Sequence, residues 1–291
     1  MGQSTEGPTG ESPGFPDAAR RQRVSATLRA TLLAFVVTML TCLLSGALKS
    51  MAGEIAAIWL ANALLLGQMM VAAPAQRYWV LAGGIAGNMA ANLLGESLAV
   101  SLSYTFADTL EVLIAFSFAP RVTTIGELLR PKALIRFLAG GVILAPLVSG
   151  VLASMLLRGQ LSGTLLPNFA NWFVSDALSL AIFTPGALVL WSGEAVHLLR
   201  AGRRLKTVGL LLLVCAVTTG VFAQNQFPLL YWALLPIMLL AFQADLAGVM
   251  VGLLLCLAIA VAFTMHGIGP LWMYPYMDME ARIFSDRKSV V

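Results

Sequence analysis

Three acidic residues lie inside long apolar stretches of this 291-residue chain: Asp108, Glu111 and Asp176. Asp108 and Glu111 are three residues apart, so an α-helix would place them on one face. Each ionised acid at the centre of a membrane-spanning helix costs about 2.5–3.5 kcal/mol, and three together on the order of 8–10 kcal/mol. Because that sum is comparable with the stability of a whole domain, we expect these carboxyls to be neutralised, hydrogen-bonded or hydrated.

Neutral polar residues are the predicted partners of these acids, because no Lys or Arg lies deep in an apolar stretch. With the three acids, the candidate sensing residues are Glu54, Trp59, Asn62, Asn88, Asn92, Asn171 and Trp172, and Ser103 and Tyr104 lie nearby in the sequence. We interpret them as a polar pocket open towards the outside. One alternative is a set of interhelical hydrogen bonds that lock the bundle, each worth about 0.6 kcal/mol. A proton or cation pathway is another.

The surrounding sequence is that of a polytopic membrane protein. Hydrophobic residues make up 59% of the chain and charged residues 11%, with a mean hydropathy of +0.85, which leaves little for a soluble domain. Nine apolar stretches are predicted, at 28–48, 52–72, 78–95, 98–119, 133–156, 168–191, 207–223, 228–242 and 246–266. Most approach the ~20 residues of a membrane-spanning helix. The expected fold is therefore an all-α bundle of about 8–10 transmembrane helices.

Basic residues are sorted to one side of this predicted bundle. If the amino terminus is cytoplasmic, 13 of the 18 lysines and arginines lie inside, which is the bias that the positive-inside rule requires. We therefore expect a cytoplasmic amino terminus. Residues 1–27 are expected to be a disordered cytoplasmic tail, since its Gly, Pro, Ser and charged residues are typical of disorder.

Several function classes are disfavoured by the same sequence. The net charge of +4 is assigned to loops that face anionic lipid, so no nucleic-acid partner is expected. Cys42, Cys215 and Cys256 lie in apolar stretches without metal-type spacing and are interpreted as packed thiols. The chain has no phosphate-binding loop, nucleophile elbow or zinc motif. We expect no enzyme activity, no cofactor and no metal.

Prolines and glycines inside the stretches predict bends and close contacts. Pro146 and Pro185 interrupt the fifth and sixth stretches and are hinge candidates. G-x-x-x-G pairs at 83–87 and 248–252 predict close helix packing.

The end of the chain differs from everything before it. Residues 286–291, followed by a stop, are what one reading frame of a common sequencing-adapter oligonucleotide would encode, so we expect residues 285–291 to be a non-native tail left by a truncation near Ser285. A further returning helix and a cytoplasmic output domain would then be missing. A natural short tail is the alternative.

Several sequence blocks, in order, resemble the membrane-associated sensor domain family of type one. They are IWLANALLLG (58–67), GNMAANLLGESL (87–98), FADTLEVLIA (106–115), LRPKALIRFLAGGVILAPLVSG (129–150), NWFVSDALSLAIFTP (171–185) and FTMHGIGP (263–270). The resemblance covers about residues 30–284, and it implies that 28–284 form an integral-membrane sensor domain. Such domains are attached in bacteria to histidine kinases, diguanylate cyclases and cyclic-di-GMP phosphodiesterases.

The resemblance also implies which residues matter. Recurrent positions of the family match Trp59, Asn62, Asn92, Glu111, Trp172, Asp176 and Pro185, whereas Asp108 stands where the family more often has Asn. The implied function is a sensory input module in the bacterial inner membrane, responding to a small ligand or a proton, with the lipid bilayer as partner and self-association into a homodimer. A full-length parent would be a histidine kinase or a diguanylate cyclase. The alternatives are a small-solute or ion-coupled transporter, and a membrane protein that presents helices to a partner.

Overall fold

The computed structural model describes residues 15–51, 58–119, 123–160, 164–198, 204–227 and 229–270. Glu54 and the expected truncation tail at 285–291 lie outside these ranges. Every regular element within the described residues is helical, so the predicted all-α fold class is confirmed.

The helices follow one another with short connections. In chain order they are α1 (Phe15–Met51), α2 (Leu60–Val71), the 3₁₀ turn η1 (Pro74–Gln76), α3 (Arg77–Asn92), α4 (Leu98–Phe118), α5 (Ile125–Leu128), α6 (Pro131–Arg136), the π-helical η2 (Phe137–Leu144), α7 (Ala145–Leu156), α8 (Leu165–Trp191), α9 (Glu194–His197), α10 (Arg204–Phe222), the 3₁₀ turn η3 (Leu230–Ala233), α11 (Leu234–Gln243) and α12 (Leu246–Met265).

Six helices of the described residues are long and apolar enough to cross a membrane. They are Arg20–Ala47, Leu98–Phe118, Pro131–Leu156, Leu165–Trp191, Arg204–Phe222 and Leu246–Thr264, with two shorter apolar helices at Leu60–Val71 and Leu230–Gln243. Together with α3 they correspond, in order, to the nine predicted stretches. The protein is an integral membrane protein, as predicted.

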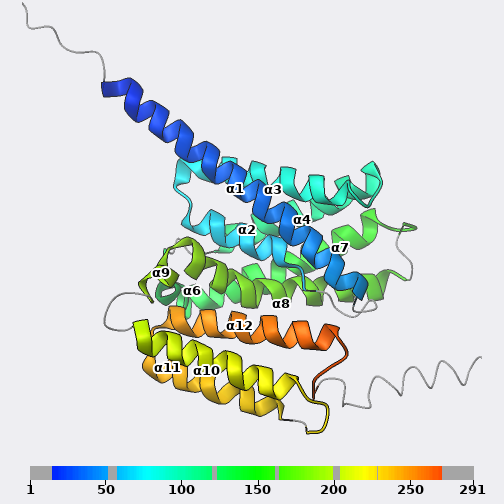
Figure 1. Cartoon of the computed structure of the whole chain (residues 1–291). Helices are drawn as coiled ribbons and strands as arrows, with labels where there is room; N and C mark the ends of the chain where they lie inside the picture. The colour runs from blue at the N-terminus through cyan, green and yellow to red at the C-terminus, as the bar shows by residue number, and fades with distance from the viewer. Residues whose placement is uncertain are drawn as a thin grey trace, which may run out of the picture.

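The helices stack in layers that run roughly side by side (Figure 1). Helix α1 crosses the bundle diagonally and packs along α3. Beneath them α2 packs on α8, while α7 contacts both α4 and α8. Helix α12 connects α8 to α10 and α11, which form the far layer. The acid-bearing helices α4 and α8 therefore lie inside the larger part of the bundle.

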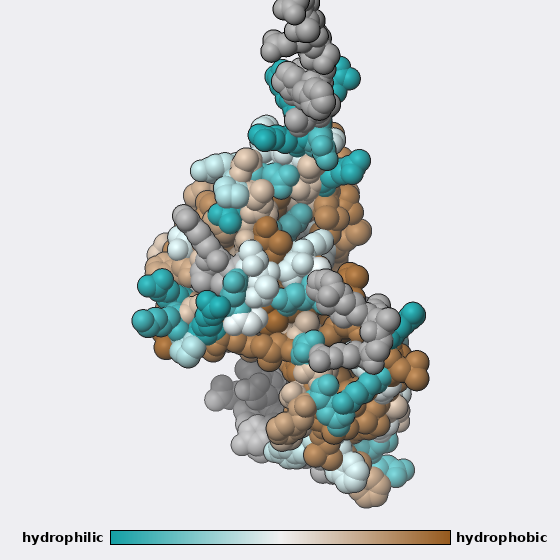
Figure 2. Space-filling model, turned by 90° about the vertical axis from the view of Figure 1, so that its left-hand side faces the viewer, coloured by the Kyte–Doolittle hydropathy of each residue, from teal (hydrophilic) through white to brown (hydrophobic). Residues whose placement is uncertain are grey.

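The short helices α6 and α9 lie at one end of the bundle (Figure 1). Figure 2 looks onto this end, where hydrophilic side chains gather, with hydrophobic surface on the flanks. Many large apolar side chains are exposed, among them Leu205 at 91% and Phe242 at 83%. Exposed apolar flanks beside a polar end are what lipid contact requires.

The amino-terminal segment corrects one expectation. Helix α1 begins at Phe15, so residues 15–27 are helical rather than part of a disordered tail. Pro16 is tolerated in the first turn, and the following Ala and Arg residues favour helix. They extend a span that lipid already stabilises, so helix formation needs no new nucleus.

The first G-x-x-x-G pair packs α3 against α1. A Cβ atom on Gly83 would collide with the backbone oxygen of Thr31, and one on Gly87 with that of Phe35. In the second pair, a Cβ on Gly252 would lie 2.8 Å from the Leu240 side chain. The predicted close packing therefore occurs within the chain.

The two prolines have different surroundings. Pro185 is buried inside α8, which continues through it as one helix. Pro146 stands in the first turn of α7, directly after the π-helical η2. The wider π-turn is a rare element that often occurs near functional sites. Hinge motion at either proline stays a prediction.

Candidate functional site

The amino-terminal end of α2 is held by its neighbours. The Trp59 backbone N–H donates to Ser179 Oγ at 2.8 Å, and the Leu60 N–H donates to Ser45 Oγ at 3.1 Å. These hydroxyls come from α8 and α1, and they satisfy N–H groups that have no partner within the helix. The first turn of α2, which carries Asn62, is thereby fixed between the two helices.

Asn62 bridges two of the three acids. Its amide nitrogen donates to Asp108 Oδ1 at 3.0 Å and to Glu111 Oε1 at 2.9 Å. Both carboxyls therefore lie on the face of α4 that meets α2, in agreement with their three-residue spacing.

Helix α3 supplies the next hydrogen bonds. Asn88 donates to Asp108 Oδ2 at 2.7 Å. The side-chain amide oxygen of Asn88, Oδ1, in turn accepts from Asn92 Nδ2 at 2.6 Å and from Thr105 Oγ1 at 3.0 Å. Asn88 is thus oriented so that its amide faces the acid.

Helices α7 and α8 approach Glu111 from the other side. Ser149 Oγ donates to Glu111 Oε2, and Trp172 Nε1 donates to Ser149 Oγ at 3.1 Å. The Trp172 ring also stacks on Tyr104 of α4, with ring centroids 5.9 Å apart. Ser149 therefore links Trp172 to Glu111 through two hydrogen bonds.

Asp176 completes the site. Its carboxyl group lies beside that of Glu111, close enough for a hydrogen bond, while its Oδ2 atom has no hydrogen-bond partner among the described residues. Ionised carboxylates accept hydrogen bonds and cannot donate them. A hydrogen bond between the two carboxyls would therefore require one of them to hold a proton.

We call these residues the acid–amide cluster: Asn62, Asn88, Asn92, Thr105, Asp108, Glu111, Ser149, Trp172 and Asp176. The three acids are 0–3% exposed. Their hydrogen-bond donors are neutral side chains, and in the described part of the chain no Lys, Arg or His bonds to them. Nor do the described residues hold a group of three His, Cys, Asp or Glu that could bind a metal ion.

Not every predicted site residue lies in the cluster. Trp59 Nε1 is buried close to the Asp108 carboxyl, but no hydrogen bond of normal geometry joins it to a described residue. Asn171 is exposed, and Ser103 bonds to the backbone of its own helix. The low exposure of the acids also differs from the expected pocket open to the outside, because neighbouring helices cover them.

Four hydroxyl residues at or next to the site were not predicted: Ser45, Thr105, Ser149 and Ser179. Thr105 precedes Asp108 by three residues, so helical spacing could have identified it. Ser149 gave no such signal, because its own stretch contains no acid.

Comparison with known families identifies the chain. The MASE1 family model matches residues 27–284, a segment that contains the whole acid–amide cluster. The chain belongs to the MASE1 family. MASE1 domains are membrane-associated sensor domains found in histidine kinases and diguanylate cyclases, as the sequence resemblance implied. No curated protein and no solved structure gave a significant match.

Proposed function

We propose that this MASE1 chain is the sensory input module of a bacterial signal-transduction protein, with the acid–amide cluster as its receiving site. The signal is a change in proton occupancy of the Glu111–Asp176 pair. The module itself carries out no catalysis; it controls an output such as a histidine kinase or a diguanylate cyclase.

The observation that carries this proposal is the meeting of α2, α3, α4, α7 and α8 at three buried carboxyls. Hydrogen bonds that merely lock a bundle need only neutral groups, whereas these acids leave Asp176 Oδ2 unsatisfied. A proton fits such a closed site because it needs no cavity. These buried acids are therefore better explained by a sensing site than by hydrogen bonds that only stabilise the bundle.

Loss of the shared proton would change the force between α4 and α8. Glu111 and Asp176 would both be acceptors, and the two negative charges would repel in a medium that screens them weakly. Asp108 is the other acid beside the pair, and the titratable groups near Asp108 in turn, Tyr104 and Cys42, supply no positive charge. The two protonation states would therefore favour two different helix arrangements, which is the condition for a signal.

Helix α8 connects the pair to the polar end of the bundle. It continues from Asp176 through Pro185 to Trp191, followed by α9. There Glu194 Oε2 accepts from the Ile125 backbone N–H at 3.4 Å, so α9 is joined to α5. A shift of α8 would thus move the surface formed by α5 and α9.

We assign this polar end to the cytoplasm of a bacterial inner membrane. The basic residues at the start of α3, at the start of α6 and at the start of α10 support the assignment, because short basic loops stay inside. The amino terminus would lie on the same side. Self-association into a homodimer is part of the proposal, since paired output domains need it.

A domain exchange tests the function. Residues 27–284 replace the matching segment of a MASE1 diguanylate cyclase, and cyclic-di-GMP is measured in cells as external pH changes. We expect output to follow pH with the natural segment and to become independent of pH in Glu111→Gln. Asn171→Gln, which changes an exposed residue outside the cluster, should respond like the natural segment.

Equal pH dependence of the natural and Glu111→Gln segments, at equal membrane levels, would contradict the receiving role. Proteoliposomes test the transporter alternative directly. Solute flux that Glu111→Gln abolishes would replace the sensor interpretation with a transport one.

A further inference from the structure

An apolar layer separates the acid–amide cluster from the end of the bundle that carries α9. Helices α2, α4 and α8 all run towards that end, because α2 leads into the basic start of α3, α4 into α5, and α8 into α9. Four residues after Asn62, Glu111 and Asp176, which is about one helical turn, these helices carry apolar side chains: Leu66, Ala115 and Leu180. All three are 0% exposed and belong to one hydrophobic core. We call them the inner layer.

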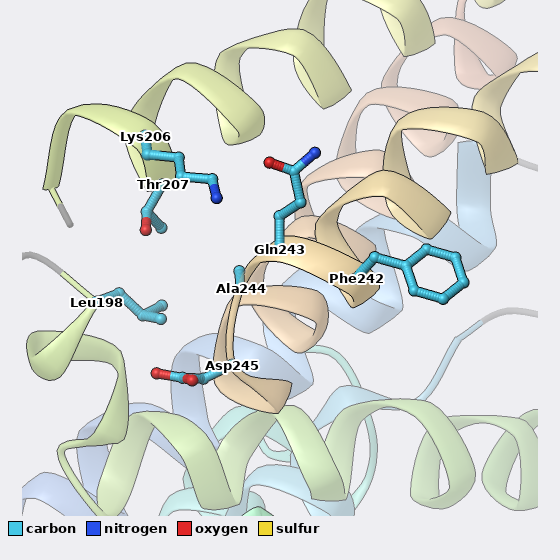
Figure 3. Close-up of a pocket in the computed structure, with 7 residues that line it drawn as sticks. All are labelled: Leu198, Lys206, Thr207, Phe242, Gln243, Ala244 and Asp245. Atoms are coloured by element: carbon cyan, nitrogen blue, oxygen red, sulfur yellow. The ribbon is translucent and has the colours of Figure 1, made fainter.

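A cavity at the same end does not reach the acids. It has a volume of about 340 Å³ and lies between the end of α9, the start of α10 and the junction of α11 with α12 (Figure 3). None of its lining residues belongs to the cluster or to the inner layer, and one of them, Leu198, is part of the same hydrophobic core. Packed apolar side chains therefore lie between this cavity and the carboxyls.

The other side of the acids has polar and aromatic neighbours that reach the surface. Asn92 follows Asn88 by four residues, while Tyr104 and Trp172 precede Asp108 and Asp176 by four. All three lie towards the end opposite α9, and all three are half-buried. We call Asn92, Tyr104 and Trp172 the outer layer. Water enters a polar, partly exposed layer more easily than a packed apolar one, so protons have an easier route from this side.

Tyr104 is the member of the outer layer that can pass a proton on. Its hydroxyl both donates and accepts hydrogen bonds, whereas the Trp172 indole only donates. Tyr104 interacts electrostatically with the exposed Glu96 and with the buried Asp108, so it lies between the surface and the cluster. Its ring is held in place by the stack on Trp172.

We propose that protons enter the cluster from the end opposite α9 through the Tyr104 hydroxyl, with Asp108 as the first acceptor. This inference rests on the proposed receiving role of the Glu111–Asp176 pair. The hydroxyl gives its proton to the Asp108 carboxylate and takes up another from water beside Glu96, so Tyr104 is restored. Asp108 then passes the proton to the ionised pair and becomes a carboxylate again.

The second transfer needs only a short bridge. Asp108 Oδ1 and Glu111 Oε1 accept from the same Asn62 nitrogen, at 3.0 Å and 2.9 Å. Two oxygens that share one donor are close enough for a single water molecule to carry the proton between them.

The helices around the cluster place no cation on this route. The sequences of α2, η2 and α7 contain no titratable side chain, and Asp176 is the only one in α8. Helix α1 contributes Cys42, and the titratable residues of α3, Arg77 and Tyr78, lie at its other end. With α9 on the cytoplasmic side, the pair would therefore follow the pH outside the cell.

Time-resolved infrared spectroscopy of the full chain in lipid nanodiscs tests this route. After a pH jump, the protonated-carboxyl band of the Glu111–Asp176 pair reports proton exchange. Tyr104→Phe keeps the ring against Trp172 and removes the hydroxyl. We expect it to slow exchange on the order of a hundredfold, as loss of a positioned proton-transfer group does. The titration midpoint should stay the same, because a relay changes the rate and not the equilibrium.

Two further variants make the test specific. Tyr231→Phe is the same change at a tyrosine of η3 that is 78% exposed, and it should exchange protons as the natural chain does. Glu96→Gln lies at the surface, where it does not disturb packing, and should slow exchange severalfold because it removes the carboxylate that attracts protons to Tyr104.

Natural exchange rates in both Tyr104→Phe and Glu96→Gln would overturn the relay while leaving the receiving role intact. A shifted midpoint in Tyr104→Phe would also overturn it, because the tyrosine would then be a structural support of the cluster. If the natural chain has no band that Glu111→Gln removes, the receiving role itself fails and this inference fails with it.

Discussion

The two parts of this membrane bundle, α1 to α8 and α10 to α12, differ in the acidic residues that they bury. Helices α1 to α8 bury Asp108, Glu111 and Asp176, whereas the sequences of α10, α11 and α12 contain no acid at all. The second part shows that apolar helices of this bundle pack together without buried carboxyls. The acids of the first part therefore cost free energy that folding alone does not require, and a function is the natural explanation for them.

Packing differs between the parts as well. Gly83 and Gly87 bring α3 into backbone contact with α1, whereas Gly252 on α12 meets only the Leu240 side chain, and Gly209 and Gly220 on α10 have no neighbouring atom within 4 Å of the place that a Cβ would occupy. The first part is thus held at short helix separations, which keep its acids and amides in register.

The largest effect is expected from breaking that contact. Gly83→Val would place side-chain atoms against the Thr31 backbone, so α1 and α3 must separate, at a cost of roughly 1–3 kcal/mol or more. Gly209→Val, with open space around it, should leave stability unchanged. Thermal unfolding of the purified chain in detergent measures both. Equal melting temperatures for the two variants would show that the parts are packed alike.

Removing the bridge between the acids should have the next largest effect. Asn62→Leu leaves one oxygen of Asp108 and one of Glu111 without a donor, which costs about 1–3 kcal/mol for each buried group. Asn225→Leu is the matched change in the second part, where the exposed Asn225 side chain accepts from the Gly269 N–H at 2.6 Å. Denaturant unfolding should show a clearly smaller loss for Asn225→Leu, and a reversed order would contradict the cluster's hydrogen bonding.

A third pair of variants separates function from stability. Trp172→Phe keeps a ring against Tyr104 but removes the donor to Ser149, at about 0.5–1.5 kcal/mol. Trp191→Phe removes a similar bond, to the Leu64 carbonyl oxygen at 3.2 Å, away from the acids. We expect similar stability losses, but a changed pH response of the domain-exchange cyclase for Trp172→Phe alone. The same response in both variants would argue against Ser149 as a link to Glu111.

The smallest effect is expected at an exposed acid. The Thr123 backbone N–H, which donates to Glu127 Oε2 at 2.8 Å, holds the pKa of Glu127 below its ordinary value. Because the pKa of Glu127 is lower in the folded state than in the unfolded state, its ionisation stabilises the fold at pH values above the ordinary pKa. This stabilisation is lost as pH falls through the folded-state pKa. Glu127→Gln should therefore lower the melting temperature slightly at neutral pH and not at all in strong acid. An equal shift at both pH values would contradict this ionic contribution.

The sequence predicted much of the fold because local patterns encode it. Apolar length located the nine helical segments, and the spacing of Asp108 and Glu111 placed them on one face. Spacing could also have excluded Asn171: it lies five residues before Asp176, about 140° away around the helix, whereas Trp172 lies four before it. The contact of Ser149 with Glu111 was beyond prediction, because it depends on how α7 and α4 are aligned rather than on either sequence alone.

The central claim is that Glu111 and Asp176 share a proton inside the bundle. Infrared difference spectroscopy of the full chain in lipid nanodiscs, between mildly acidic and mildly alkaline pH, tests it most directly. The account predicts a protonated-carboxyl band that disappears in both Glu111→Gln and Asp176→Asn and remains in Glu194→Gln. A band that persists unchanged in the first two variants would contradict it.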